Sequence, residues 1–228
     1  SLMGQERYAE AENILQALAT GDPRNSNIWY ELGRARRLKE DYLGAAEAYT
    51  QATEIDSNDA EAWRDLGITY GALNDHPNAE VTYLRATIAD PDDPFLWYCL
   101  GCCRREQGKN AEAVEAFIAA ADLNIDNPRL WDYLGREFGD LNELTSSKDA
   151  FLRSIELSPG ESRTWFHLGI ACDALDETSE AEEAYLESIR LDPNDADVWS
   201  NLGAIRSGQG QLVQAEEATL QAINTNQA

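Results

Sequence analysis

The chain has 228 residues, 43% of them apolar and 26% charged, and this composition excludes a wholly disordered protein. Its formal charge of −24, from 18 basic and 42 acidic side chains, argues against nucleic acid or an anionic membrane surface as the partner. No apolar run is long enough to span a bilayer, so we expect no membrane insertion. Four cysteines are too few for a disulfide scaffold, which favours a reducing compartment and a cytoplasmic protein.

The amino-terminal stretch predicts one helix that stands apart from the rest. Residues 1–4 include the single methionine, and we interpret them as a remnant of expression. Apolar residues then recur at helical spacing and a proline follows them: Ala11, Leu15, Leu18 and Pro23. This pattern predicts a lone helix over about residues 5–20.

From residue 26 onward the chain repeats itself with a period of 34 residues. All six tryptophans share one register, and each opens a word of the form W-x-x-L-G: Trp29, Trp63, Trp97, Trp131, Trp165 and Trp199. A fixed period of this length indicates stacked repeats, in contrast to a single globular core. We expect six units that start near residues 26, 60, 94, 128, 162 and 196.

Each unit carries two helical stripes. The tryptophan, leucine and glycine mark one face of a first helix, and small residues around one ring, such as Ala45, Tyr49 and Ala52, mark a second. Small residues let two helices approach closely around the ring. Residues that suit a left-handed helix end share one column between the stripes: Asn74, Gly108, Asn142 and Gly210.

These words and columns resemble the tetratricopeptide repeat, most closely in the stretch DPNDADVWSNLG at residues 192–203. The resemblance implies an all-α fold, a right-handed superhelical solenoid of antiparallel helix pairs that forms one domain over residues 5–228. It covers residues 26 to about 225 and identifies no partner, because this family binds many unrelated molecules. Arginines replace an aromatic residue in three units and a threonine replaces the last ring: Arg36, Arg104, Arg206 and Thr219.

Three cysteines in the third unit raise the question of a metal or redox site. Cys99, Cys102 and Cys103 are closely spaced, but zinc needs about four ligands and the chain has neither a second CxxC word nor a histidine pair. Cys103 and Cys172 occupy columns of small or buried residues. We therefore favour inert thiols over the two alternatives, a redox-sensitive pair and a metal site.

The acidic words DPDDP and DPNDAD resemble the start of a calcium-binding loop. The twelfth position, where such a loop needs a bidentate glutamate, is Gly101 or Gly203, so we interpret these aspartates as helix caps. No phosphate-binding, dinucleotide-binding, zinc-peptidase or serine-hydrolase word occurs. We predict no catalytic residue, no cofactor and no metal, and hence a protein that is not an enzyme.

The resemblance places the first helices on the concave side of the solenoid, where we expect the partner. This face holds seven arginines and six acidic residues, so it is nearly neutral while the rest of the chain is strongly negative. Binding hot spots favour arginine and aromatic residues. The predicted groove residues are Tyr30, Arg34, Arg37, Arg64, Phe95, Tyr98, Arg105, Arg129, Tyr133, Arg136, Arg163, Phe166 and His167. The alternative is local pairing, for example of Arg129 or Arg136 with Asp132.

The second helices are expected to form the outer face. Their run of acidic residues is interpreted as a solvated surface that keeps the protein soluble: Glu182, Glu183, Glu187, Glu216 and Glu217.

We predict an interaction scaffold or adaptor that binds an extended peptide or a partner helix with acidic and apolar residues in the groove. Two rival hypotheses remain open. One is a self-assembling structural arm that forms a weak homo-oligomer through its terminal helices, and the other is the repeat region of a larger multidomain enzyme.

Overall fold

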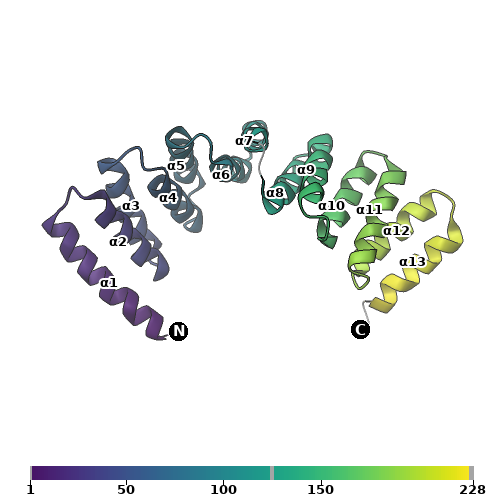
Figure 1. The fold of residues 1–228 in the computed structure, drawn as a ribbon, viewed down its shortest axis with the longest axis horizontal. Coiled ribbons are helices and arrows are strands. Elements are labelled where there is room, and N and C mark those ends of the chain that lie inside the picture. Colours follow the sequence, from purple (N-terminus) through teal and green to yellow (C-terminus); the bar gives the residue numbers. More distant parts are fainter. Residues whose placement is uncertain (1, 124–125, 226–228) are drawn as a thin grey trace. The chain divides into compact units, whose positions relative to one another are not determined.

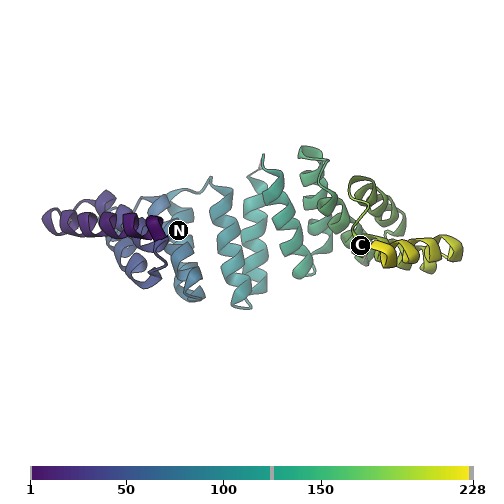
Figure 2. The same cartoon turned by 90° about the horizontal axis from the view of Figure 1, so that it is seen from below.

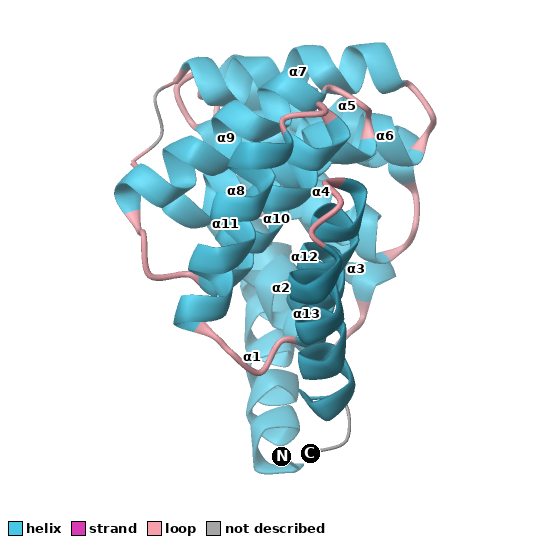
Figure 3. Cartoon of the chain, turned by 90° about the vertical axis from the view of Figure 1, so that its right-hand side faces the viewer, coloured by secondary structure: helices cyan, strands magenta, loops and turns pink. Residues whose placement is uncertain are grey.

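The computed structural model describes residues 2–123 and 126–225, and these residues form thirteen α-helices and no strand (Figure 1; Figure 3). The helices are α1 (Leu2–Gly21), α2 (Ser26–Leu38), α3 (Tyr42–Ile55), α4 (Ala60–Ala72), α5 (His76–Ala89), α6 (Pro94–Glu106), α7 (Asn110–Asp122), α8 (Pro128–Asp140), α9 (Leu144–Leu157), α10 (Ser162–Ala174), α11 (Thr178–Leu191), α12 (Ala196–Gly208) and α13 (Leu212–Thr225). The first helices of the six units begin where the sequence placed the repeats, and α1 is longer than the predicted lone helix. Within the described residues, no helix is long and apolar enough to cross a bilayer.

The six 34-residue repeats are grouped into two larger compact units. The first compact unit is Ser1–Leu123 with α1–α7, and the second compact unit is Asn124–Ala228 with α8–α13. Within each unit, helices that follow one another in the sequence lie side by side and alternate in direction (Figure 2). Each unit is thus a stack of antiparallel helix pairs. That both units form one continuous solenoid stays a prediction from the 34-residue period.

Close packing within each pair depends on a glycine in the first helix that faces a ring in the second. A Cβ atom placed on Gly135 would lie 2.6 Å from the ring of Phe151, and one on Gly169 would lie 2.4 Å from the ring of Tyr185. Such distances are too short for any real contact, so only glycine fits there. The same contact recurs in the first unit as Gly33 with Tyr49, Gly67 with Tyr83 and Gly101 with Phe117.

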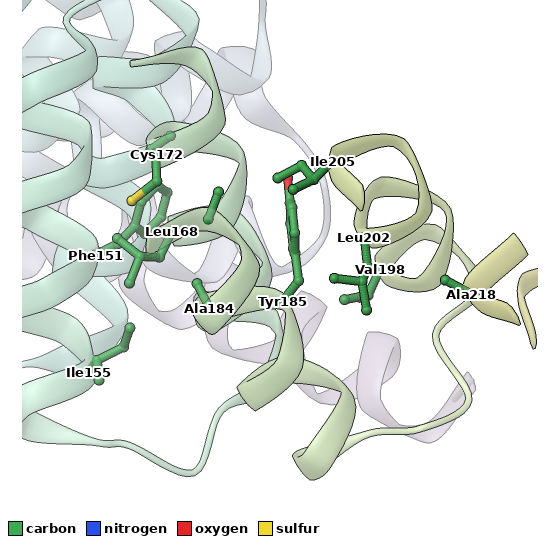
Figure 4. Close-up of a cluster of buried hydrophobic side chains, with 12 residues drawn as sticks. Phe151, Ile155, Leu168, Cys172, Ala184, Tyr185, Val198, Leu202, Ile205 and Ala218 are labelled. Atoms are coloured by element: carbon green, nitrogen blue, oxygen red, sulfur yellow. The ribbon is translucent and has the colours of Figure 1, made fainter. Parts of the chain in front are cut away.

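The buried rings form layers of the core between successive helices. Figure 4 shows the core cluster of the second unit, where Tyr185 packs among Leu168, Val198 and Leu202. Phe151 belongs to the same cluster and is 3% exposed. Fully burying such a side chain stabilises the fold by about 1.5–3 kcal/mol. Because every layer joins neighbouring helices, stability is distributed along the stack.

The repeated tryptophan connects the first helix of its repeat to the preceding linker by a hydrogen bond. The indole Nε1 of Trp29 donates to the carbonyl oxygen of Pro23 at 3.1 Å, and that of Trp165 donates to Pro159 at 2.9 Å. The same bond over six residues is made by Trp63, Trp97 and Trp199. Tryptophan combines a large apolar ring with an N–H donor, which explains why no other aromatic residue occupies the column.

The turn between the two helices of a repeat contains one residue in the left-handed conformation. The sequence predicted it at Asn74, Gly108, Asn142 and Gly210, and all four have positive φ. The same column also holds Glu40 and Asp176, with φ of 64° and 60°. These two were not predicted, because glutamate and aspartate are less typical than glycine or asparagine of this conformation.

Three arginines stand where the family has an aromatic residue, and they form ion pairs with the helix that precedes their repeat. Arg36 Nε lies 3.1 Å from Glu12 Oε1. Arg104 Nε lies 3.2 Å from Glu80 Oε1. All four side chains are about one-fifth exposed or less, and each pair spans 24 residues of sequence. The aromatic packing typical of the family is thus replaced by partly buried ion pairs.

The same pairing of arginine with glutamate recurs in the last repeat and corrects one interpretation from the sequence. Arg206 Nε lies 2.9 Å from Glu182 Oε1, and both side chains are less than one-fifth exposed. Glu182 therefore belongs to an interface between helices, whereas its neighbour Glu183 is exposed, as predicted for the outer surface.

The hydrogen bonds around Glu80 link stability to pH. Glu80 accepts bonds from Arg104 Nε at 3.2 Å, Gln107 Nε2 at 2.9 Å and Lys109 Nζ at 2.5 Å. Burial by itself would raise the pKa of Glu80, but these bonds outweigh it and hold the pKa below its ordinary value. A carboxylate with a lowered pKa stabilises the fold above its ordinary pKa, and this contribution is lost as the pH falls through the lowered value.

We expect Glu80→Gln to lower the free energy of unfolding by about 1–2 kcal/mol at neutral pH, because the variant loses charge-assisted hydrogen bonds. The difference from the parent should narrow as the pH falls from the ordinary pKa of glutamate, about 4.3, through the lowered pKa of Glu80. Urea unfolding followed by circular dichroism at neutral pH and near pH 3 measures both. Glu115→Gln, on the exposed side of α7, is the matched control and should change little. A difference that persists at the lower pH would contradict the prediction.

Candidate functional site

In the first unit, a buried carboxylate lies beneath the predicted groove residues. Asp65 is 5% exposed and accepts a hydrogen bond from the hydroxyl of Tyr30 at 3.2 Å. Arg64 lies 3.3 Å from Asp65 and 3.1 Å from Glu61. Burial and the charge of Asp65 raise the pKa of Tyr30, so its hydroxyl remains a donor at neutral pH. Tyr30 and Arg64 are therefore held in fixed positions on the first-helix face.

Two further arginines of the first unit pair locally, as the alternative interpretation held. Arg34 lies 2.7 Å from Glu31, and its guanidinium lies over the ring of Tyr30 at 5.8 Å from the centroid. Arg105 lies 2.8 Å from Glu106. Since exposed ion pairs contribute little, the pair of Arg34 with Glu31, whose side chains are 46% and 49% exposed, adds little to stability.

The remaining predicted residues of the first unit connect the surface with the core. Arg37 lies beside the hydroxyl of Tyr49, and this interaction raises the pKa of Arg37. Phe95 is 42% exposed, and its ring centroid lies 6.2 Å from that of Tyr98. Tyr98 in turn lies 6.0 Å from the buried ring of Phe117. An apolar ligand group on Phe95 would thus rest on a supported aromatic surface.

In the second unit, Asp132 organises the first-helix face. Its carboxylate lies 3.3 Å from Arg136 Nε and 3.5 Å from His167 Nδ1, and it accepts a hydrogen bond from Thr164 Oγ1 at 3.2 Å. Burial alone would raise the pKa of Asp132, but His167 and Arg136 outweigh it and lower the pKa. Arg136 also lies over the ring of Tyr133, 4.8 Å from the centroid. The local pairing of Arg136 with Asp132 is confirmed.

A cleft of about 420 Å³ opens between the amino-terminal ends of α8 and α10. Arg129, Tyr133 and Arg163 line it, and all three were predicted groove residues. The acidic residues Asp132 and Glu161 also contribute to its wall. Among the residues that the structure describes, neither Arg129 nor Arg163 has an ion-pair partner, and the pairing of Arg129 with Asp132 is not formed. The cleft therefore presents two uncommitted guanidinium groups beside an aromatic ring.

Phe166 and His167 complete the aromatic part of this face. Their ring centroids lie 5.8 Å apart, and Phe166 is 6.0 Å from the buried ring of Tyr185. His167 lies 5.5 Å from Phe151. Both residues are partly buried, so they support the face more than they project from it.

The cysteine geometry supports the interpretation as inert thiols. Burial raises the pKa of Cys103 and of Cys172 to about 11. Burial, together with the neighbouring Cys102, raises the pKa of Cys99 as well. Thiols rather than thiolates are present at neutral pH, and thiols are poor nucleophiles and metal ligands. In the described part of the chain, no three histidine, cysteine or acidic side chains lie close enough to hold a metal ion.

The aspartates that resemble a calcium loop cap helices. Asp93 Oδ1 accepts from the backbone N–H of Phe95 at 2.9 Å, and Asp195 Oδ1 accepts from that of Asp197 at 3.0 Å. These bonds satisfy donors at the first turns of α6 and α12. The interpretation as helix caps is confirmed for Asp93 and Asp195, whereas Asp90 and Asp192 accept from backbone N–H groups of the linkers, two residues further on.

The structure brings part of the predicted site together. Contacts or a shared cleft join Tyr30 with Arg34, Phe95 with Tyr98, Arg129 with Tyr133 and Arg163, Arg136 with Tyr133, and Phe166 with His167. None of these contacts or shared clefts joins the first compact unit to the second. That the thirteen residues form one groove stays a prediction.

The polar partners beneath this face were not predicted. Asp65 stands in a column of mixed residues, so nothing in the sequence marked it as buried. Thr164 did carry a signal, because the other five units have an apolar residue in its column. A lone polar residue in an apolar column indicates a hydrogen bond, here the one that Thr164 donates to Asp132.

Tandem helix pairs with this packing define a helical-repeat protein. Family models of the tetratricopeptide repeat match residues 1–60, 39–94, 82–115, 162–195 and 184–217. These matches extend over most of the sequence, and the chain belongs to the tetratricopeptide repeat family. The fold supports a role as a scaffold for protein–protein interaction.

Solved structures share this fold at low sequence identity. The C-terminal part of a TPR repeat-containing protein from Cytophaga hutchinsonii is 16% identical with a TM-score of 0.78, over 100% of this chain and 93% of that one. YrrB, a TPR protein with an unusual peptide-binding site, is 23% identical with a TM-score of 0.68, over 79% and 93%. MamA from Desulfovibrio magneticus RS-1 is 17% identical with a TM-score of 0.65, over 75% and 96%. No curated protein matches the sequence significantly.

Proposed function

We propose that the chain is a non-enzymatic scaffold that binds an extended peptide or a partner helix, rich in acidic and apolar residues, along the face of its first helices. The observation that carries this proposal is the cleft in the second unit, where Arg129 and Arg163 stand uncommitted beside Tyr133. Arginines next to aromatic rings are typical of binding hot spots. YrrB, a TPR protein that shares this fold, has a peptide-binding site, and this supports a peptide as the ligand.

The charge of the chain supports a protein partner. At −24 it would repel nucleic acid and anionic membranes, while the first-helix face is nearly neutral and can accept an acidic segment. The proposal assigns no reaction to the chain, as is general for scaffolds of this family. Four cysteines are too few for a disulfide scaffold, which favours a reducing location such as the cytoplasm.

The test uses a 12-residue peptide selected from a randomised display library on the immobilised protein. Binding of this synthetic peptide to the full chain is then measured by fluorescence anisotropy. We expect Arg136→Glu to weaken binding about tenfold or more, because the change removes a charge-assisted contact and adds a repulsive charge.

Arg153→Glu is the matched control on an outer helix, α9. Arg153 is 38% exposed and Arg136 44%, and each pairs with a carboxylate one helical turn away. The control should change peptide affinity less than twofold, and circular dichroism should show that both variants fold. Equal weakening by the two variants, or a selected peptide that ignores Arg136→Glu, would refute binding on the first-helix face.

Self-assembly is a second candidate, favoured by exposed apolar residues on the terminal helices. On α13 these are Leu212, Val213, Leu220 and Ile223, which are 48% to 68% exposed. On α1, Ile14 is 62% exposed. Contact between such faces of two copies would bury them. Light scattering distinguishes the candidates, because an assembly arm gains mass with concentration and a monomeric scaffold does not.

A further inference from the structure

We propose that the cleft between α8 and α10 is a carboxylate-binding subsite, in which Arg129 and Arg163 hold one carboxylate of the ligand and Tyr133 contacts its apolar neighbour. The proposal rests on the proposed function, since it names the group that the scaffold recognises. It goes further by assigning this recognition to one cleft and two side chains.

The two arginines occupy the same position in consecutive repeats. Arg129 is the second residue of α8 and Arg163 the second residue of α10, one period of 34 residues apart. Both are exposed, and both line the same cleft of about 420 Å³. The repeat itself therefore places two arginines, one from each helix, on the wall of one cleft.

Other arginines of the predicted groove differ from these two because they already have partners. Arg34 lies 2.7 Å from a carboxylate, Arg64 lies 3.1 Å from one and Arg136 lies 3.3 Å from one. Arg129 and Arg163 form no ion pair with any residue in the described ranges, although the chain has 42 acidic residues. In so acidic a protein, two neighbouring arginines without a partner indicate a place for an external anion.

The acidic residues of the cleft determine which anion fits. Asp132 is already paired with Arg136, whose Nε lies 3.3 Å from the carboxylate. Glu161, the residue before α10, makes no capping hydrogen bond and adds one negative charge to the wall. Two arginines against one uncompensated glutamate favour a ligand with a single charge. A carboxylate satisfies this condition better than a doubly charged phosphate.

The carboxylate has two sources in a protein partner, an aspartate or glutamate side chain and the chain's own carboxyl terminus. Either one can accept paired hydrogen bonds from a guanidinium group. Tyr133, which is 42% exposed on the same cleft, would contact an adjacent apolar side chain in both cases.

Three pentapeptides separate these sources in binding to the full chain. Acetyl-Ala-Leu-Glu-Leu-Ala-amide carries an internal carboxylate, acetyl-Ala-Leu-Gln-Leu-Ala carries a terminal one, and acetyl-Ala-Leu-Gln-Leu-Ala-amide carries none. Their affinities are measured from NMR shifts of the arginine side chains in ¹⁵N-labelled protein. We expect at least one acidic peptide to bind about tenfold more tightly than the neutral one, and the tighter of the two identifies the source.

Two variants locate the effect in the cleft. Arg129→Gln with Arg163→Gln should abolish the preference for the acidic peptide, while the matched pair Arg153→Gln with Arg190→Gln on outer helices should preserve it. Glu161→Gln should strengthen acidic binding about two- to fivefold by removing a repulsive charge. Equal binding of acidic and neutral peptides, no measurable binding of any, or a preference that survives in the cleft variant would overturn the proposal.

These outcomes are separate from those that test the scaffold function. If the selected 12-residue peptide depends on Arg136 but no carboxylate preference exists, the subsite is wrong and the first-helix face still binds. If the selected peptide ignores Arg136, binding on that face is wrong whatever the pentapeptides do.

Discussion

Replacing Phe151 with alanine is expected to lower the free energy of unfolding by about 3–5 kcal/mol. The ring is 3% exposed and packs in the core cluster with Leu168 and Cys172. Alanine would lose the buried ring and leave a cavity between helices whose backbones can collapse only partly. Urea unfolding followed by far-ultraviolet circular dichroism measures the change.

The adjacent residue provides the control. Leu152 lies on the same helix but is 39% exposed, so Leu152→Ala should cost less than about 1 kcal/mol. If both variants lost the same stability, the ring of Phe151 would not be the main contact of its layer.

Gly135→Ala should be the second most damaging single change, at about 1–3 kcal/mol, because the new methyl group would lie 2.6 Å from the ring of Phe151. Gly208→Ala is the matched control at the end of α12, where an added Cβ meets no atom within 4 Å. There alanine should raise the free energy of unfolding by up to about 1 kcal/mol, since it favours the helix. Urea unfolding of both variants should therefore give shifts of opposite sign.

A double variant tests whether the glycine is required by the ring. When Phe151→Ala has removed the ring, Gly135→Ala should cost nothing or should stabilise the protein. An additive loss in the double variant would show that the glycine is needed for a reason other than this contact.

The helix pairs could be predicted from the sequence because their signal recurs six times. One tryptophan column fixed the register, and α2, α4, α6, α8, α10 and α12 begin at the predicted positions. The left-handed turn residues were predicted where asparagine or glycine stands in the column. They were missed at Glu40 and Asp176, where packing of the unit imposes a conformation that the residue itself does not favour.

The candidate site was predictable only where partners lie on one helix. Arg136 and Asp132 are one helical turn apart, so their pairing followed from the spacing. The bond between Tyr30 and Asp65 spans 35 residues, and it depends on how neighbouring first helices lie. Likewise, the sequence offered Arg129 as a partner for Asp132, but Asp132 pairs with Arg136 and lies 3.5 Å from His167 Nδ1 of the next repeat.

The pairs between arginine and glutamate also determine which helices can be neighbours. The two columns hold Glu12 with Arg36, Ala46 with Tyr70, Glu80 with Arg104, Lys148 with Cys172, and Glu182 with Arg206. A repeat moved to another place in the stack would bring a glutamate next to a tyrosine, or an arginine next to an alanine. Either mismatch leaves a partly buried charge without its partner, which is strongly unfavourable. Copies that share one consensus are therefore not interchangeable, and the chain resists stacking in a changed order.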